Sequence, residues 1–394
     1  MFRKLTLILL LLVVAGALGG AFYVLKHRRS SSTHLDHLHM AEALMESKDY
    51  DNAIQNLLPV VQAGKRFERA DYALYLLAQV YDAAGHKEAG DIWKRLADDF
   101  PQSEYALDAR LRQAQSFLDS TPLKSREIYE DLSKTGPGLV HDKAILGIAQ
   151  SYDKEKNVDK ARELYYGIIA SVTELSVLEL TKNRLSEINT ERLWSPVLDD
   201  FCQLYTVGKG DVPIKIGPKF GTTAWFVEEA NGVKAGGLKP GRRLKVPKEP
   251  YHIIVSKELC RLELRTASGR FVKWYPCGVG EQSYKTPAGN YYIIDKQINP
   301  VWYPPAGGRF AAGDPENALG SRWMSIGGSL GIHGTNAPDT IGKPKSAGCI
   351  RMHNKDVEEL YKLVTLNTNV TIVDGSEMNV SYVPKNATAG ITER

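Results

Sequence analysis

The first half of the chain repeats one pattern of small and large apolar positions. A small residue recurs every 36 positions, and an apolar or aromatic residue follows each of them four positions later. The small positions are Ala53, Ala89, Ser125 and Ala161, and the larger ones are Leu57, Trp93, Tyr129 and Tyr165. A constant period of this length is typical of stacked helical pairs. The pattern therefore predicts an all-α repeat region over residues 36–195.

This region resembles tetratricopeptide repeats, whose usual period is 34 residues. Short turn segments at 48–53 and 157–161 lead into the second helix of a pair, and Asp99-Phe100-Pro101 closes a unit. Two roles stay open for the repeats. They are either a helical spacer or a groove that binds a peptide or docks a protein partner.

An apolar segment precedes the repeats. Residues 5–25 contain no charged side chain and are flanked by basic residues on both sides. The length suits a membrane helix, which needs about 20 apolar residues. Ala15-Gly16-Ala17 would suit signal-peptide cleavage, but the apolar run continues beyond it to Leu25, which favours an uncleaved anchor. We expect a membrane anchor with its flanks at 1–29, whose orientation the charges leave undecided.

A compact α/β pattern follows the repeats. A short strand begins at Tyr205, residues 214–220 predict a helical turn, and Thr222-Thr223 can cap a second helix. A turn and a return strand close the unit over 238–247. The unit at 204–248 resembles a LysM module, which implies binding to glycans that contain N-acetylglucosamine, such as peptidoglycan. Pro213 departs from the pattern, although proline is tolerated in a first helical turn.

The last large region, 250–373, is rich in β-prone runs. Apolar stretches at 253–264 and 271–275 flank the turn Ala267-Ser268-Gly269-Arg270 and predict a hairpin. Further strands are expected near 290–294, 324–326 and 370–373. One helix is predicted after Asn354, which can cap it, with an apolar face at Val357, Leu360, Tyr361 and Val364. We therefore expect a mostly-β, sandwich-like domain, followed by a flexible polar tail at 374–394.

Charge and composition limit the partners. Charged residues make up 24% of the 394 residues, the net charge is +4, and no basic block carries interleaved aromatics. These values do not favour nucleic acid as a partner. No motif has metal-ligand spacing, and no cofactor is expected. Cys260 and Cys277 lie at equal distances from the 268–269 turn, so a cross-strand disulfide between them is left open.

Candidate chemistry lies in two short segments near the end of the β-rich region. Gly331-Ile332-His333-Gly334-Thr335 is followed by Ser346-Ala347-Gly348-Cys349-Ile350-Arg351-Met352, which places a histidine and a cysteine sixteen positions apart among small residues. A free thiol has a pKa near 8.5, so a cysteine nucleophile at neutral pH benefits from a nearby imidazole. The segments predict a thiol nucleophile with its base.

Both segments resemble the catalytic signature of the L,D-transpeptidases of the YkuD type, which act on peptidoglycan. The likeness extends upstream to Lys285-Thr286-Pro287-Ala288-Gly289 and to Asn299 through Pro305. It implies that Cys349 is the nucleophile and His333 the general base and acid. The implied positioning and substrate-binding residues are Ser346, Ala347, Gly348, Arg351, Gly334, Trp302 and Tyr303. Position 347 is often His in the family and is Ala here, so only its backbone amide keeps a role.

We therefore expect a multidomain, membrane-anchored, extracytoplasmic transferase of cell-wall biogenesis. Its parts are an anchor, helical repeats, a LysM-like module and a mostly-β catalytic domain. The resemblance implies peptidoglycan stem peptides and glycan strands as partners and a thioester on Cys349 as intermediate. Two alternatives remain: an L,D-carboxypeptidase or hydrolase acting on the same stems, and a non-catalytic peptidoglycan-binding scaffold.

Overall fold

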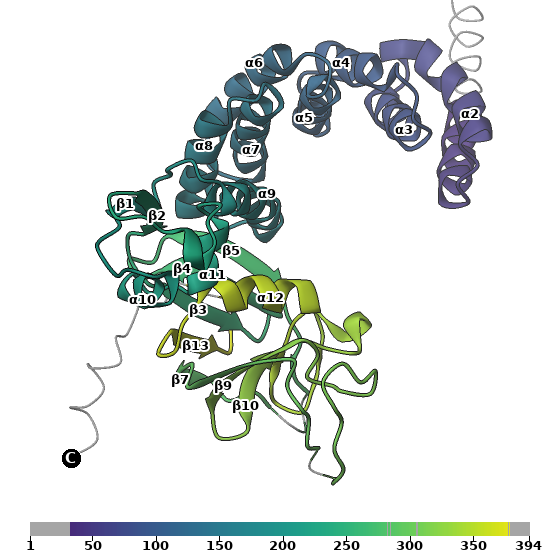
Figure 1. Cartoon of the computed structure of the whole chain (residues 1–394). Coiled ribbons are helices and arrows are strands. Elements are labelled where there is room, and N and C mark those ends of the chain that lie inside the picture. The colour runs from purple at the N-terminus through teal and green to yellow at the C-terminus, as the bar shows by residue number, and fades with distance from the viewer. Residues whose placement is uncertain (1–31, 282, 284, 305, 377, 379–394) are drawn as a thin grey trace, which may run out of the picture. The chain divides into compact units, whose positions relative to one another are not determined.

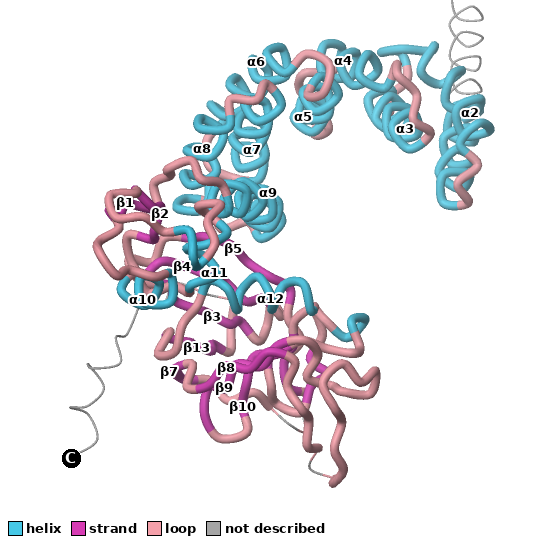
Figure 2. The backbone as a smooth tube through the Cα atoms, viewed as in Figure 1, coloured by secondary structure: helices cyan, strands magenta, loops and turns pink. Residues whose placement is uncertain are grey.

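The computed structural model describes residues 32–376, except 282, 284 and 305, together with residue 378 (Figure 1). Contacts divide the chain into two compact units, with the boundary between Leu178 and Glu179. Strands occur only after the boundary in the described chain (Figure 2). No helix among the described residues is long and apolar enough to cross a membrane. The anchor predicted at 1–29 and most of the tail predicted at 374–394 lie outside the described residues.

The N-terminal unit is a series of helices in which each packs on the next. A first helix covers 32–46 and is followed by α2 (Tyr50–Ala63), α3 (Ala70–Ala83), α4 (Ala89–Asp99), α5 (Ala106–Phe117), α6 (Pro122–Leu132), α7 (Leu139–Lys154) and α8 (Val158–Ser171). All eight positions of the 36-residue pattern are buried. Ser125 replaces the small alanine without leaving its hydroxyl unpaired, because Oγ donates to the Ala114 carbonyl at 2.7 Å.

The next helix, α9 (Leu175–Trp194), continues past the boundary into the C-terminal unit. Its later residues contact the hairpin of β4 (Arg261–Thr266) and β5 (Phe271–Pro276). Lys182 Nζ lies 2.5 Å from a carboxylate oxygen of the fully buried Glu263, and Asn189 donates to the Val272 carbonyl at 2.8 Å. We predicted from the sequence that the repeats end at residue 195. In the structure, polar side chains bind much of α9 to the β-rich unit.

The LysM-like module pairs β1 (Cys202–Thr206) with β2 (Arg243–Pro247) in antiparallel fashion. Two short helices lie between these strands, α10 (Pro213–Lys219) and α11 (Ala224–Glu229). Pro213 occupies the first turn of α10, where its missing N–H costs nothing. Thr223 caps α11 as predicted, since its Oγ1 accepts from the amide of Phe226 at 3.3 Å.

Two main sheets build the remaining β-rich part. The first has the order β5-β4-β3-β13-β7, where β3 is Tyr251–Ser256, β13 is Asn369–Val373 and β7 is Gly289–Tyr292. The second has the order β12-β10-β9-β8, formed by Ile350–Arg351, Leu330–His333, Arg322–Gly327 and Asp295–Ile298. A small parallel pair joins β6 (Val279–Gly280) to β11 (Pro344–Ser346).

The hairpin about 267–270 is confirmed, but the apolar run at 253–264 is not one strand. It forms β3 and β4, joined by a turn at 257–260 in which Cys260 has a φ of 49°. The polar run Ser256-Lys257-Glu258 interrupts the apolar stretch at this break. Cys260 and Cys277 lie on facing positions, with the Cys277 amide donating to the Cys260 carbonyl at 2.9 Å. Both are free thiols in the structure.

Helix α12 (Asn354–Leu363) follows β12 and contacts α11, β9 and β10. Thr222 and Thr223 of the LysM-like module donate to the carbonyls of Leu363 and Lys362 at its C-terminal end. Its predicted N-terminal cap is wrong, because His353 occupies the cap position and the Asn354 side chain bonds to other segments.

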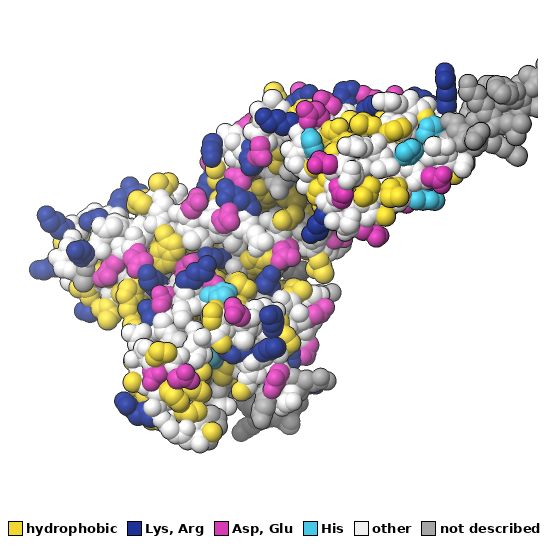
Figure 3. All heavy atoms as spheres, turned by 90° about the vertical axis from the view of Figure 1, so that its right-hand side faces the viewer, with side chains coloured by type: hydrophobic (Ala, Val, Ile, Leu, Met, Phe, Trp, Pro, Cys, Tyr) yellow, Lys and Arg dark blue, Asp and Glu magenta, His cyan; other side chains and the backbone are white. Residues whose placement is uncertain are grey.

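On the face shown in Figure 3, basic and acidic side chains are interspersed over the molecule.

Candidate active site

The candidate nucleophile and base lie on neighbouring strands. Strands β10 and β12 are parallel, with Ile332 opposite Ile350 and His333 opposite Arg351. Side chains alternate between the two faces of a strand, so His333 and Arg351 project from the face opposite that of the fully buried isoleucines. Cys349 immediately precedes β12. The register therefore brings the histidine and the cysteine of the two sequence segments to one place.

The thiol of Cys349 is only partly accessible, and the structure holds it as a neutral group. Its Sγ lies 3.4 Å from the Ser329 carbonyl oxygen. Burial raises the pKa of Cys349 above its ordinary value, while the backbone N–H of Gly331 and the charge of Arg351 act in the opposite direction. Because burial dominates, the thiol is protonated near neutral pH.

The imidazole of His333 is buried and oriented by backbone groups. Its Nδ1 lies 2.7 Å from the Gly334 carbonyl oxygen, which requires a hydrogen on Nδ1 and leaves Nε2 as the basic nitrogen. The pKa of His333 is lowered to about 4, mainly by burial and also by the charge of Arg351, while hydrogen bonds to the backbone of Gly334 and Leu319 act in the opposite direction. The ring also packs beside Trp323, with centroids 5.6 Å apart. Among the described atoms, this imidazole and the Cys349 thiol are not hydrogen-bonded to each other.

The turn that carries the thiol is braced from two sides. Ser346 Oγ donates to the Cys349 carbonyl at 2.6 Å and accepts from the Gly348 amide at 3.2 Å. Thr286 Oγ1 donates to the Gly348 carbonyl at 2.7 Å and accepts from the Gly280 amide at 2.8 Å. Gly348 has a φ of 107°, which only glycine adopts readily. The braces fix the backbone on both sides of Cys349.

Arg351 contacts backbone as well. One guanidinium nitrogen donates to the Lys345 carbonyl, while its buried Nε has no partner in the described structure. The backbone N–H and C=O of Arg351 both bond to Gly278, at 2.9 and 2.8 Å. Arg351 thus ties β12 to the segment before β6, and its charge lowers the pKa of both Cys349 and His333.

A cavity of about 400 Å³ lies beside the nucleophile turn. It is lined by Lys285, Pro287, Gly327, Gly328, Ser329, Leu330, Ala347 and Gly348. Ala347 and Gly348 of the predicted set therefore face this cavity, but Trp302 and Tyr303 are not among its lining residues. Trp302 stacks on Phe310 with ring centroids 5.2 Å apart, and Tyr303 is 67% exposed.

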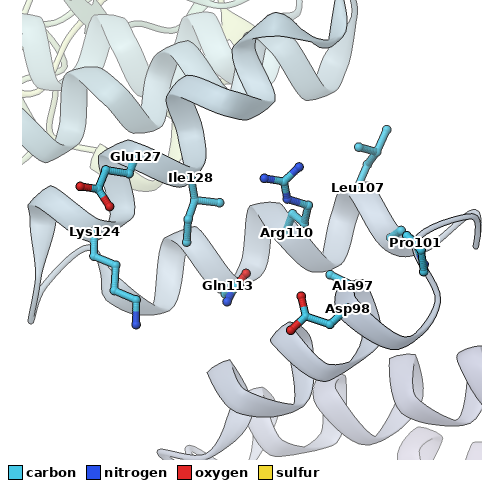
Figure 4. A pocket seen from close by; sticks show the side chains of 10 residues that line it. Ala97, Asp98, Pro101, Leu107, Arg110, Gln113, Lys124, Glu127 and Ile128 are labelled. Carbon is cyan, nitrogen blue, oxygen red and sulfur yellow. The ribbon is translucent and has the colours of Figure 1, made fainter.

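A second hollow, of about 600 Å³, lies in the N-terminal unit (Figure 4). It is bordered by α4, α5 and α6, and Asp98, Arg110, Lys124 and Glu127 contribute charges of both signs. Its lining contains no cysteine or histidine. Within the described residues, no group of three or more His, Cys, Asp or Glu side chains is placed to hold a metal ion.

Comparisons with known proteins identify three domain families in the chain. The profile of the L,D-transpeptidase catalytic domain matches residues 250–372, a LysM domain profile matches 205–247, and a tetratricopeptide repeat profile matches 72–103. The YkuD protein of Bacillus subtilis (strain 168), named as an L,D-transpeptidase, is 39% identical over 175 residues, which are 43% of this chain and 97% of that protein. The chain belongs to the L,D-transpeptidase family.

Other L,D-transpeptidases match shorter parts. The ErfK/SrfK protein of Salmonella typhimurium (strain LT2) is 33% identical over 135 residues, covering 31% of this chain and 44% of that protein. The solved catalytic domain of the E. faecium L,D-transpeptidase shares 22% identity, covers 32% of this chain and 98% of that domain, and has a TM-score of 0.27. The three domain profiles and the YkuD relative confirm the resemblances found in the sequence, to L,D-transpeptidases, LysM modules and tetratricopeptide repeats.

Three residues of this L,D-transpeptidase site have contacts that the sequence did not reveal. Trp323 pairs with His333 across β9 and β10, and an added Cβ at Gly331 would lie 2.4 Å from its ring. Thr286, part of the upstream segment that resembles the family, is buried beneath the nucleophile turn. Asn354, predicted as a helix cap, bonds to the backbone around His333. Such contacts join distant segments, so spacing along the chain gives no signal for them.

Proposed function

We propose that the chain is a peptidoglycan L,D-transpeptidase that forms a thioester on Cys349. The observation that carries this proposal is the parallel register of β10 and β12, which places His333 beside the turn of Cys349. The adjoining cavity gives the turn access to a substrate. The proposed donor is a peptidoglycan stem peptide, cleaved between the L-centre of its third residue and the following D-amino acid.

In the first half-reaction, Sγ of Cys349 attacks the scissile carbonyl carbon. Its proton passes to Nε2 of His333, because Nδ1 is already bound to the Gly334 carbonyl. The C–N bond then breaks, and the imidazolium returns the proton to the departing amine of the D-amino acid. Since the thiol pKa is raised and the imidazole pKa is lowered, the pair starts neutral and the proton moves during attack.

This step requires the thiol to turn away from the Ser329 carbonyl, to which it is bonded in the structure. Catalytic hydrogen bonds are often long or misaligned without substrate and form in the reacting complex. The open cavity beside Ser329 is the space from which a bound stem would displace the thiol toward His333.

Backbone amides would hold the oxyanion. The Gly348 amide already donates to Ser346, whereas in the described structure the amide of Cys349 has no acceptor. The Gly331 amide faces Sγ of Cys349. Gly331 lies at a register shift between β9 and β10, where a backbone N–H can lack a hydrogen bond to the neighbouring strand. We therefore assign the oxyanion to the amides of Cys349 and Gly331. Removing one such donor typically costs about 2.7–4 kcal/mol of transition-state stabilisation.

In the second half-reaction, an amine from a neighbouring stem attacks the thioester carbonyl. Neutral Nε2 of His333 takes the amine proton, the new amide forms, and the thiolate leaves and is reprotonated. The family membership and the LysM match support peptidoglycan as the polymer bound and an extracytoplasmic, cell-wall location. The tetratricopeptide match at 72–103 supports a protein partner for the helical unit.

Intact-protein mass spectrometry tests the thioester. A carbapenem, whose strained lactam carbonyl imitates the scissile amide, should add once to the protein and not at all to Cys349→Ala. Cys277→Ala is the matched control, because that buried thiol lies outside the site and should leave the adduct unchanged. His333→Ala should slow acylation by about 10²–10⁴-fold. An adduct that persists in Cys349→Ala would remove this thiol from the mechanism.

The acceptor is tested separately with a stem tetrapeptide and a mixture of amines. A cross-linked product supports transpeptidation, whereas a cleaved tripeptide alone would show that water is the acceptor and that the enzyme is a hydrolase.

A further inference from the structure

The side chain of Asn354 joins two segments on either side of the candidate base. Its Oδ1 accepts from the amides of Ser321 and Thr335, both at 3.1 Å, and its Nδ2 donates to the Thr335 carbonyl at 3.0 Å. None of these bonds is to its own helix, although Asn354 is the first residue of α12. The amide therefore uses both its acceptor and its donor to connect segments 33 and 19 residues away.

Two glycines leave space for this amide. An added Cβ at Gly334 would lie 2.1 Å from Oδ1 of Asn354, and one at Gly320 would lie 2.2 Å from the same atom. Gly320 also has a φ of 64°, which favours glycine. Any larger residue at either position would expel the amide. Gly334, predicted as a positioning residue, is thus in van der Waals contact range of Asn354 and not among the residues that line the cavity.

The same two segments supply the backbone groups around the imidazole. The Gly334 carbonyl accepts from Nδ1 of His333, and the backbone of Leu319 also acts on this ring. Asn354 bonds to Thr335, which directly follows Gly334, and to Ser321, which lies two residues after Leu319. A shift of the Thr335 segment would move the Gly334 carbonyl, which fixes the tautomer of the imidazole.

We propose that Asn354 is a positioning residue that holds the Gly334 carbonyl against His333 and so keeps Nε2 available to the Cys349 thiol. The catalytic part of this inference rests on the proposed function, while the effect on the imidazole does not. The role needs an amide: a carboxylate would keep the two acceptor bonds but place an oxygen against the Thr335 carbonyl, and an alanine would lose all three bonds. Replacing a neighbouring side chain on α12 would have no such effect.

The test uses the full-length protein with ¹⁵N-labelled histidine rings and the variants Asn354→Ala and Asn354→Asp. His353→Ala is the matched control, because this preceding residue makes no side-chain cap bond. The His333 signals, assigned by their loss in His333→Gln, should report hydrogen on Nδ1 in the wild type and the control. In Asn354→Ala we expect mixed tautomers and a His333 pKa above the wild-type value of about 4, as water reaches the ring.

Carbapenem acylation of Cys349 is measured in parallel. We expect a loss of about tenfold to a hundredfold in Asn354→Ala, the range that a displacement of about 1 Å can produce, and a smaller loss in Asn354→Asp. A wild-type tautomer and rate in Asn354→Ala would overturn the proposal, as would equal changes in His353→Ala. If Asn354→Ala does not fold, a wild-type rate in Asn354→Asp overturns it. If the tautomer changes but wild-type Cys349 is never acylated, the proposed function fails and the positioning role stands.

Discussion

A buried lysine of the LysM-like module provides the sharpest test of how the C-terminal unit is held together. Lys245 is 1% exposed, and its Nζ donates to the carbonyls of Arg192, Ser195 and Val197 and to the carboxylate of Asp199 at 2.6 Å. These acceptors lie at the end of α9 and in the loop after it. One ammonium group therefore joins the helix, the loop and strand β2.

Lys245→Met keeps much of the side-chain volume but leaves the Asp199 carboxylate, 2% exposed, without a cation. Breaking a buried ion pair by removing one partner costs about 3–5 kcal/mol. For a unit of this size, each kcal/mol lowers the melting temperature by about 2–4 °C, so we expect a loss of about 6–20 °C. The double variant Lys245→Met/Asp199→Asn should recover part of this loss, because it removes the unpaired charge.

Tryptophan fluorescence follows the unfolding, because five of the six tryptophans lie after Leu178. Lys219→Met is the matched control: this lysine of the same module is 54% exposed and lies 3.6 Å from Asp211. Because this lysine is solvent-exposed, the pair is expected to contribute only about 0–1 kcal/mol. A Lys245→Met variant no less stable than Lys219→Met, or a double variant as unstable as the sum of its single variants, would refute the reasoning.

Two further predictions concern the site and its support. The rate of carbapenem acylation should be nearly constant between about pH 5.5 and 8. The lowered pKa of His333, about 4, keeps the imidazole unprotonated in this range, and the raised pKa of Cys349 keeps the thiol neutral. A rate that falls with a midpoint near pH 6.5, the ordinary pKa of histidine, would contradict this. A chain beginning at residue 173 should fold and be acylated, whereas one beginning at 200 should lose cooperative unfolding, because it lacks the α9 side chains that bond to Glu263 and Val272. Equal unfolding curves for the two shortened chains would show that α9 is dispensable.

Features encoded by local spacing could be predicted from the sequence. The 36-residue repeat recurs at buried positions, and the proline and threonines of the LysM-like module occupy the helix ends expected of them. The segments around His333 and Cys349 could be recognised because each carries its residue types within a few consecutive positions. Their meeting in space depends on the pairing of β10 with β12.

Contacts between distant segments could not be predicted in the same way. Asn354 has the residue type of a helix cap and stands at a helix start, yet its amide bonds to Ser321 and Thr335. The decisive factor is the space left by Gly320 and Gly334, which is known only once those segments meet. The ion pair between the buried Glu263 and Lys182 is a second contact of this kind. The sequence near β4 gives no signal for a lysine 81 residues away.

The contacts of α12 change how a LysM deletion should be interpreted. Thr222 and Thr223 satisfy the Leu363 and Lys362 carbonyls at the C-terminal end of this helix, while Asn354 at its other end holds the loop of His333. Removing 204–248 would leave these carbonyls without their donors and would disturb a helix that supports the base. Loss of activity after such a deletion would not by itself demonstrate glycan targeting. Substitutions at exposed LysM positions such as Lys209, which leave both threonines in place, separate binding to peptidoglycan from support of the catalytic site.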